Sequence, residues 1–102
     1  MAIMERQAAN MRKTNTISIY EDYAEIILTG RHRGSCIIDL CDYERVSQHC
    51  WVNKQNSVAQ ARIDGTIVSL PRFIMNAQKG ERVITNRTKP FDYRQCNLLL
   101  VR

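Results

Sequence analysis

The sequence contains no apolar run of about 18 residues, the length that a membrane-spanning helix needs. Its opening segment, MAIMERQAANMRK, is too polar for a secretory signal peptide. The four cysteines, Cys36, Cys41, Cys50 and Cys96, do not show the spacing of a secreted disulfide framework. We therefore expect neither a membrane-anchored nor a secreted protein, and the free thiols favour a reducing, cytoplasmic environment.

Internal repeats, low-complexity segments and interdomain linkers are also missing. With 102 residues, of which 44% are hydrophobic and 25% charged, the chain has the composition of one small globular domain. We expect a flexible N-terminal arm over residues 1–15 and a single compact domain over residues 16–102.

Alternation of polar and apolar residues predicts antiparallel strands. Residues 16–20 and 23–28 are expected to form a hairpin, and residues 36–40 a third strand after a glycine-bounded loop at 30–34. The dipeptide Asp64-Gly65 is a strong signal for a second hairpin. The strands expected later in the chain cover residues 51–53, 58–62, 66–69, 82–85 and 98–101.

A short helix is expected where the apolar spacing changes. Tyr43, Val46 and Cys50 fall at i, i+3 and i+7, on one helical face. Asp39 or Asp42 is expected to cap the first turn of this helix.

Two further helical segments are predicted in the second half. Ser69 is a suitable N-cap for one, because Pro71 is tolerated in a first helical turn. Asp92 is expected to cap a last helical turn before the final strand. The predicted class is α+β, with small antiparallel sheets and short helices.

The net charge of +5 is unevenly distributed. Residues 1–50 carry six Lys or Arg against seven Asp or Glu, whereas residues 51–102 carry nine against three. A basic half attracts phosphate backbones with an affinity that depends on salt. The alternative is a solvated basic face that keeps the protein soluble.

The basic half supplies most candidate binding residues, because its cations alternate with polar side chains that suit phosphate contacts. These candidates are Arg62, Arg72, Arg82, Arg87, Lys89 and Arg94. Arg31 and Arg33, on the glycine-bounded loop, form a second basic point that either reaches phosphate or is a plain turn. The candidates for stacking on bases are the four tyrosines, Tyr20, Tyr23, Tyr43 and Tyr93, of which only Tyr93 lies in the basic segment.

Thiolate and imidazole ligands suggest zinc as a further possibility. Cys36 and Cys41 have a C-x4-C spacing, and His49 and Cys50 are adjacent, which matches no zinc signature. We therefore expect buried or half-buried free thiols and no metal site or cofactor.

The stretch from Leu70 to Leu98, LPRFIMNAQKGERVITNRTKPFDYRQCNL, resembles the HNH motif of small phage-type endonucleases. Such an enzyme is expected to read roughly LHR, L, IM, N and A, a short loop ending in Gly, then VDH, a polar loop, DNR and NL. The residues that remain in step are Leu70, Arg72, Ile74, Met75, Asn76, Ala77, Gly80, Val83, Asp92, Arg94, Asn97 and Leu98.

The departures fall on the catalytic positions of that motif. Pro71 stands where the resemblance places the first His, Ile84-Thr85 stands where it places Asp-His, and Tyr93 replaces an Asn. A metal-dependent phosphodiester hydrolase needs a hard cation on oxygen ligands and a His that activates water. Ile84 can supply neither function, and the pKa of the Thr85 hydroxyl is far too high for a base.

The upstream sequence IYEDYAEIILT, followed by IIDLCDYERV and a Trp, resembles the β-rich segment before the HNH motif in many phage and mobile-element endonucleases. With both segments, the resemblance covers residues 17–101. It implies an AP2-like segment over residues 16–69 and a degenerate HNH-like, ββα-metal segment over residues 70–102.

Three functions follow as hypotheses. The first is a non-catalytic protein that binds DNA, RNA or a nucleoprotein complex. The second is a phage-encoded inhibitor of a host defence nuclease, of anti-CRISPR or anti-restriction type, acting by protein contact in a bacterial host cell. The third is a divergent active nuclease that uses Asp92, Asn97 and a histidine from elsewhere, with His32 and His49 as the two available. We expect no catalytic residue.

Overall fold

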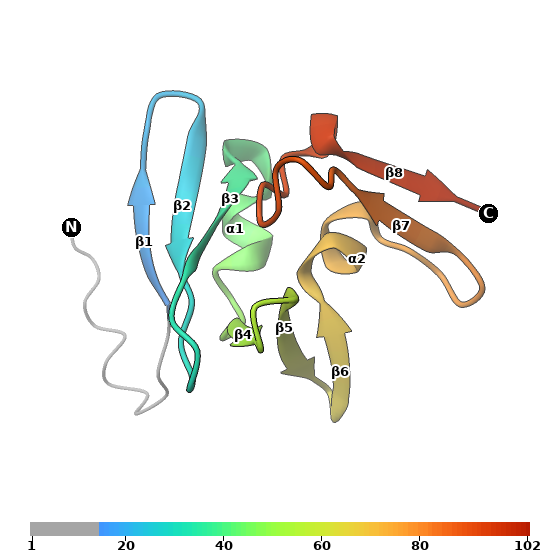
Figure 1. The fold of residues 1–102 in the computed structure, drawn as a ribbon, viewed down its shortest axis with the longest axis horizontal. Helices are drawn as coiled ribbons and strands as arrows, with labels where there is room; N and C mark the ends of the chain where they lie inside the picture. The colour runs from blue at the N-terminus through green and yellow to red at the C-terminus, as the bar shows by residue number, and fades with distance from the viewer. Residues whose placement is uncertain (1–14) are drawn as a thin grey trace.

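The computed structural model describes residues 15–102, which form a small α+β domain with three antiparallel sheets and two short α-helices (Figure 1). Residues 1–14, most of the arm expected from the sequence, lie outside the described residues. None of the helices within residues 15–102 is long and apolar enough to cross a membrane.

The first sheet has the order β1-β2-β3, with β1 at Thr16–Ile19, β2 at Tyr23–Ile27 and β3 at Ser35–Asp39. All three strands were predicted to within about one residue at each end. The register pairs Ala24 with Ile38, and both side chains are fully buried. The alternation of buried and accessible residues therefore directs one face of this sheet into the core.

The 3-10 helix η2 (Leu40–Asp42) and the helix α1 (Tyr43–Val46) follow β3. The observed helix is shorter than the apolar spacing predicted, because α1 ends at Val46, before Cys50. Asp39 and Asp42 occupy the N-cap positions of η2 and α1, as predicted, although neither carboxylate accepts a capping hydrogen bond.

Those two carboxylates bind partners that are distant in the sequence. Asp39 Oδ2 accepts a hydrogen bond of 2.8 Å from the backbone N–H of Gln95. Asp42 is buried, and its carboxylate binds Arg45 at 2.7 Å and the side-chain amide of Gln95 at 3.0 Å. Both residues therefore fasten the C-terminal part of the chain to the first sheet.

The second sheet has the order β4-β5-β6, with β4 at Val52–Lys54, β5 at Val58–Ile63 and β6 at Thr66–Ser69. The β5–β6 hairpin turns through Asp64 and Gly65, whose φ angles are 51° and 80°. Positive φ at both central residues is the geometry that the Asp-Gly signal predicts.

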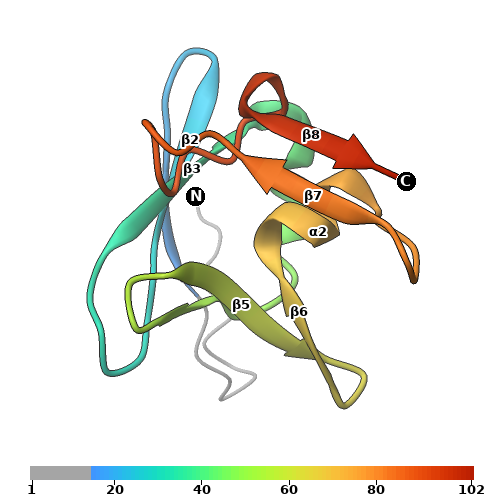
Figure 2. The same ribbon diagram turned by 45° about the vertical axis from the view of Figure 1, so that its right-hand side comes forward.

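The helix α2 (Leu70–Met75) and the two-stranded sheet of β7 (Arg82–Thr85) and β8 (Leu98–Val101) complete the domain (Figure 2). Ser69 occupies the N-cap position as predicted, although its hydroxyl accepts no capping hydrogen bond. The predicted last helical turn is the 3-10 helix η3 (Gln95–Asn97). Its N-cap is Arg94, so the prediction that Asp92 caps it was wrong.

The core lies where these elements meet around Trp51, which is fully buried. Its indole N–H donates to the carbonyl of Val46 at 2.8 Å, and its ring packs edge-on against Phe73. Asn15, expected at the end of the arm, accepts a hydrogen bond of 2.7 Å from the Trp51 backbone N–H and donates to the Ile27 carbonyl at 3.0 Å. Trp51 is thus a core anchor, as a large aromatic residue after a helix suggests.

Tyr93 connects the first sheet to the second. Its backbone N–H donates to the Ile37 carbonyl of β3 at 2.7 Å, and its hydroxyl accepts a hydrogen bond of 3.3 Å from the Ala59 N–H of β5. Tyr93 itself belongs to the segment between β7 and β8. Only 3% of its surface is exposed, so the expectation that this ring stacks on bases was wrong.

We predict that Tyr93→Phe lowers the free energy of unfolding by about 1–3 kcal/mol, because the buried Ala59 N–H loses its acceptor. Urea unfolding followed by Trp51 fluorescence measures the change. Tyr20→Phe is the matched control, since Tyr20 is 45% exposed and should unfold like the original chain. Equal effects of the two substitutions would contradict the role assigned to the Tyr93 hydroxyl.

Candidate nucleic-acid interface

A groove of about 420 Å³ opens where α2, β7 and the segment after β7 face the start of β5. Its volume lies within the range of about 300–1,000 Å³ that is typical of small-molecule sites. The residues that line it are Ser57, Val58, Ser69, Pro71, Arg72, Arg82, Val83, Thr85, Asn86, Arg87, Pro90, Phe91 and Tyr93.

Three of the predicted basic residues, Arg72, Arg82 and Arg87, meet in this groove. Arg72 comes from α2, Arg82 begins β7, and Arg87 lies two residues after β7. No Asp or Glu is among the described residues that line the groove. The groove is therefore a site of concentrated positive charge, in which an anion meets no carboxylate of the lining.

The three guanidinium groups differ in how firmly they are held. Arg72 donates to the backbone carbonyls of Glu81 and of Gln78, the latter at 3.1 Å, which fixes it against the loop after α2. Arg82 and Arg87 are exposed, and within residues 15–102 neither forms an ion pair. Both side chains are therefore fully available for a phosphate, whereas Arg72 offers only the N–H groups that do not bind Glu81 and Gln78.

Asn86 organises the loop that presents Arg87. Its Oδ1 accepts hydrogen bonds from the Thr88 N–H at 3.0 Å and from the Thr88 hydroxyl at 2.7 Å, an arrangement typical of an Asx turn. Its Nδ2 donates to Asn97 Oδ1 at 3.1 Å. Asn97, which the hypothesis of a divergent nuclease uses, thus has a structural contact, and the loop carrying Arg87 and Lys89 is fastened to η3.

Arg94 is not among the lining residues of the groove, and its positive charge is paired with Asp92. Its Nε and Nη2 atoms donate to the two carboxylate oxygens at 2.9 and 2.7 Å, and its guanidinium lies 5.9 Å from the centre of the Tyr23 ring. The hydrogen bonds from Arg94 lower the pKa of Asp92, while partial burial opposes that shift. The pair is a structural clamp between the C-terminal segment and the first sheet.

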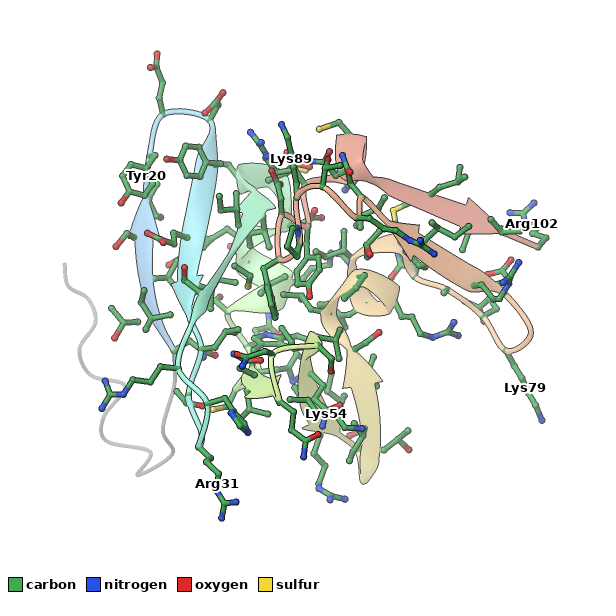
Figure 3. The ribbon with its side chains drawn as sticks, in the orientation of Figure 1. Tyr20, Arg31, Lys54, Lys79, Lys89 and Arg102 are labelled. Carbon is green, nitrogen blue, oxygen red and sulfur yellow. The ribbon has the colours of Figure 1, made fainter. Side chains whose placement is uncertain are left out.

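The remaining predicted cations are not among the residues that line the groove. Arg31 and Lys89 point away from opposite ends of the molecule in Figure 3. The backbone carbonyl of Arg33 accepts a hydrogen bond of 3.0 Å from Asn53, which ties the loop between β2 and β3 to the second sheet. Arg62 is exposed on β5, near the hairpin carbonyl of Gly65.

The structure brings together two positions that the HNH resemblance singles out. Pro71 and Thr85, where that motif would carry histidines, both line the groove. The two histidines of the chain serve elsewhere: His32 pairs with β4, and His49 packs edge-on against Phe73 at 5.4 Å between ring centroids. The groove thus holds an arginine set but neither histidine.

Sequence reasoning missed several contributors to this region. Ser57 and Ser69 line the groove from the second sheet, and Phe91 lines it from the segment after the basic loop. No local pattern places the two serines there, because their position depends on how the sheets pack. Phe91 had a weak signal, since it follows a basic loop directly in Lys89-Pro90-Phe91.

The four cysteines do not gather at one place in the described part of the chain. Cys36 is buried in the core, where burial raises the pKa of its thiol to about 12. Within residues 15–102, the one group of three close metal-ligating side chains is Asp39, Cys41 and Asp42, which includes neither His49 nor Cys50.

We predict that the Asp92–Arg94 pair makes stability depend on pH. Because the pKa of Asp92 is lowered in the folded state, its contribution is complete above its ordinary value of about 3.9 and is lost as the pH falls through the lowered value. Asp92→Asn should therefore flatten the acid side of a plot of unfolding free energy against pH. The exposed Asp64→Asn is the control, and acid limbs that coincide for the two variants would contradict this role.

Comparison of the chain with protein-family models, with curated proteins and with solved structures gives no match. What the groove does is therefore argued from its own residues.

Proposed function

We propose that this protein binds nucleic acid through the groove and does not cut it. The observation that carries the proposal is that Arg72, Arg82 and Arg87 converge on one groove with no carboxylate among its described lining residues. Cations placed in this way release counterions from a phosphate backbone, which makes the affinity strongly dependent on salt.

The polar lining fits the same ligand. The hydroxyls of Ser57 and Ser69 and the amide of Asn86 line the groove beside the arginines. Contacts of this kind go to phosphate and sugar oxygens, and they position a nucleic acid without reading its sequence. We therefore expect binding with little sequence preference.

The proposal that the protein does not cut nucleic acid is supported by the groove residues at which the HNH resemblance would place histidines. Pro71 has no titratable group, and the Thr85 hydroxyl is not a base near neutral pH. Asp92, the carboxylate within the segment that resembles an HNH motif, is paired with Arg94. A degenerate HNH-like segment over residues 70–102, with its former catalytic groove kept as a binding surface, accounts for these features together.

We predict that the double variant Arg82→Gln and Arg87→Gln binds a 20-nucleotide DNA or RNA more weakly than the original chain. The slope of the logarithm of the association constant against the logarithm of the salt concentration should fall in magnitude by about 2, because each lost phosphate contact removes about one unit. The matched control is Arg62→Gln with Lys79→Gln, which removes the same charge from exposed residues outside the groove. Fluorescence anisotropy at several salt concentrations measures both.

Equal slopes for the groove variant and the control would mean that the groove is not the binding site. Lack of any binding at about 50 mM salt would contradict the proposed function as a whole. Nicking of supercoiled plasmid by the unaltered protein with Mg²⁺ or Mn²⁺ would contradict its non-catalytic part.

A second candidate is inhibition of a host defence nuclease through protein contact. Ile84 and Leu99 are cross-strand neighbours on the sheet of β7 and β8, and they are 46% and 59% exposed. An exposed apolar pair next to a cationic groove suits a partner that presents both protein and nucleic acid. An RNA-guided or restriction nuclease bound to its nucleic acid has this chemistry.

This candidate predicts co-migration of the protein with a purified nuclease–nucleic acid complex in size-exclusion chromatography. The variant Ile84→Ser with Leu99→Ser should abolish co-migration, because it removes the apolar contact. Ile67→Ser, which alters a side chain that is 54% exposed on β6, serves as control. Co-migration that survives the double substitution would exclude the Ile84–Leu99 pair as the contact.

A further inference from the structure

Phe91 is an aromatic side chain among the lining of the cationic groove. It is half-buried, and its ring lies 6.0 Å from the ring of Tyr93 between centroids, at an interplanar angle of 58°. The neighbouring Pro90 and the opposed Pro71 and Val58 add further apolar surface. The groove therefore has two chemically different parts, one of guanidinium groups and one of apolar and aromatic carbon.

The backbone holds Phe91 in a conformation that aromatic residues rarely adopt, with φ at 68°. Hydrogen bonds on both sides enforce it. The Phe91 carbonyl accepts a hydrogen bond of 2.9 Å from the Ile37 N–H, and the Asp92 N–H donates to the Lys89 carbonyl at 3.1 Å. Strained residues held by their surroundings in this way are common where a side chain must be fixed for a ligand.

The two parts of the groove match the two parts of a nucleotide. A phosphate suits Arg72, Arg82 and Arg87, and a base suits an aromatic ring flanked by proline. Within a duplex each base is covered on both faces by its neighbours, so only an unpaired nucleotide offers a free face. A duplex could contact the exposed arginines, but it could not place a base on Phe91.

Cations also flank the groove along the chain. Ser57, in the groove, follows Lys54 by three residues, and Pro90, in the groove, follows Lys89 directly. In Figure 3, Lys89 lies near the upper edge of the molecule and Lys54 below its centre. The chain therefore carries a lysine close in sequence to each of two lining segments of the groove.

We propose that the groove binds one unpaired nucleotide of a single-stranded nucleic acid, with the base against Phe91 and the phosphate among Arg72, Arg82 and Arg87. This inference rests on the proposed function and narrows it, since it names single strands rather than duplexes as the ligand.

Fluorescence anisotropy measures the affinity of the protein for a 10-nucleotide single strand, as DNA and as RNA, and for the duplex of the same sequence. The unaltered protein should bind the single strand about 5- to 150-fold more tightly than the duplex, as expected for one stacked base. Phe91→Leu should reduce single-strand affinity by about 5- to 150-fold, the equivalent of one stacking contact, and leave duplex affinity unchanged. If the protein binds single-stranded DNA and single-stranded RNA with different affinities, the tighter of the two is the preferred ligand.

Phe73→Leu is the matched control. Phe73 is also half-buried, but it packs against Trp51 and does not line this groove. It should leave both affinities unchanged, provided that thermal melting shows the variant to be folded. A loss of single-strand affinity equal to that of Phe91→Leu would overturn the inference.

A measurement on the unaltered protein avoids dependence on the fold of a variant. A single strand containing 2-aminopurine should lose fluorescence on binding, because stacking on an aromatic ring quenches this base. Unchanged or increased fluorescence, or equal affinity for duplex and single strand, would overturn the inference while the proposed function stands. If neither strand form binds at about 50 mM salt, both proposals fail.

Discussion

Tyr93 joins the first sheet to the second from the chain segment that leads into the third. Its backbone N–H extends the first sheet at Ile37, and its hydroxyl accepts a hydrogen bond from Ala59 in the second. The third sheet has only two strands, and an isolated hairpin of that size is marginally stable in water. The Tyr93 ring is buried in the common core, so one side chain holds the first two sheets together beside the segment that continues into the third.

The groove depends on the same short segment. Phe91 contributes to the groove, Asp92 binds Arg94, Tyr93 enters the core, and Arg94 lies against Tyr23. The left-handed conformation of Phe91 turns the chain just before the bridge that Asp92 forms with Ile37, so four neighbouring side chains reach different surroundings. The groove and the core are therefore built in part by one short segment rather than by separate parts of the fold.

The local features of the fold could be predicted from the sequence, whereas the contacts between distant segments could not. Strand alternation and the Asp64-Gly65 turn are determined within a few residues, and both were confirmed. The capping hydrogen bonds do not form, because Asp39 instead accepts a hydrogen bond from Gln95, 56 residues away. The uneven charge indicated a basic surface, but it did not show that Arg94 is neutralised by its own neighbour Asp92.

The exposure of Arg82 and Arg87 also bears on how this protein can change over generations. Surface substitutions away from buried contacts usually alter stability by no more than about 0.5 kcal/mol, so these two positions can vary without endangering the fold. Tyr93 has no such freedom, since a smaller residue would leave a cavity and an unpaired amide between the first and second sheets. Mutation at the rim can therefore change the charge of the groove without loss of the fold, whereas mutation of the tyrosine cannot.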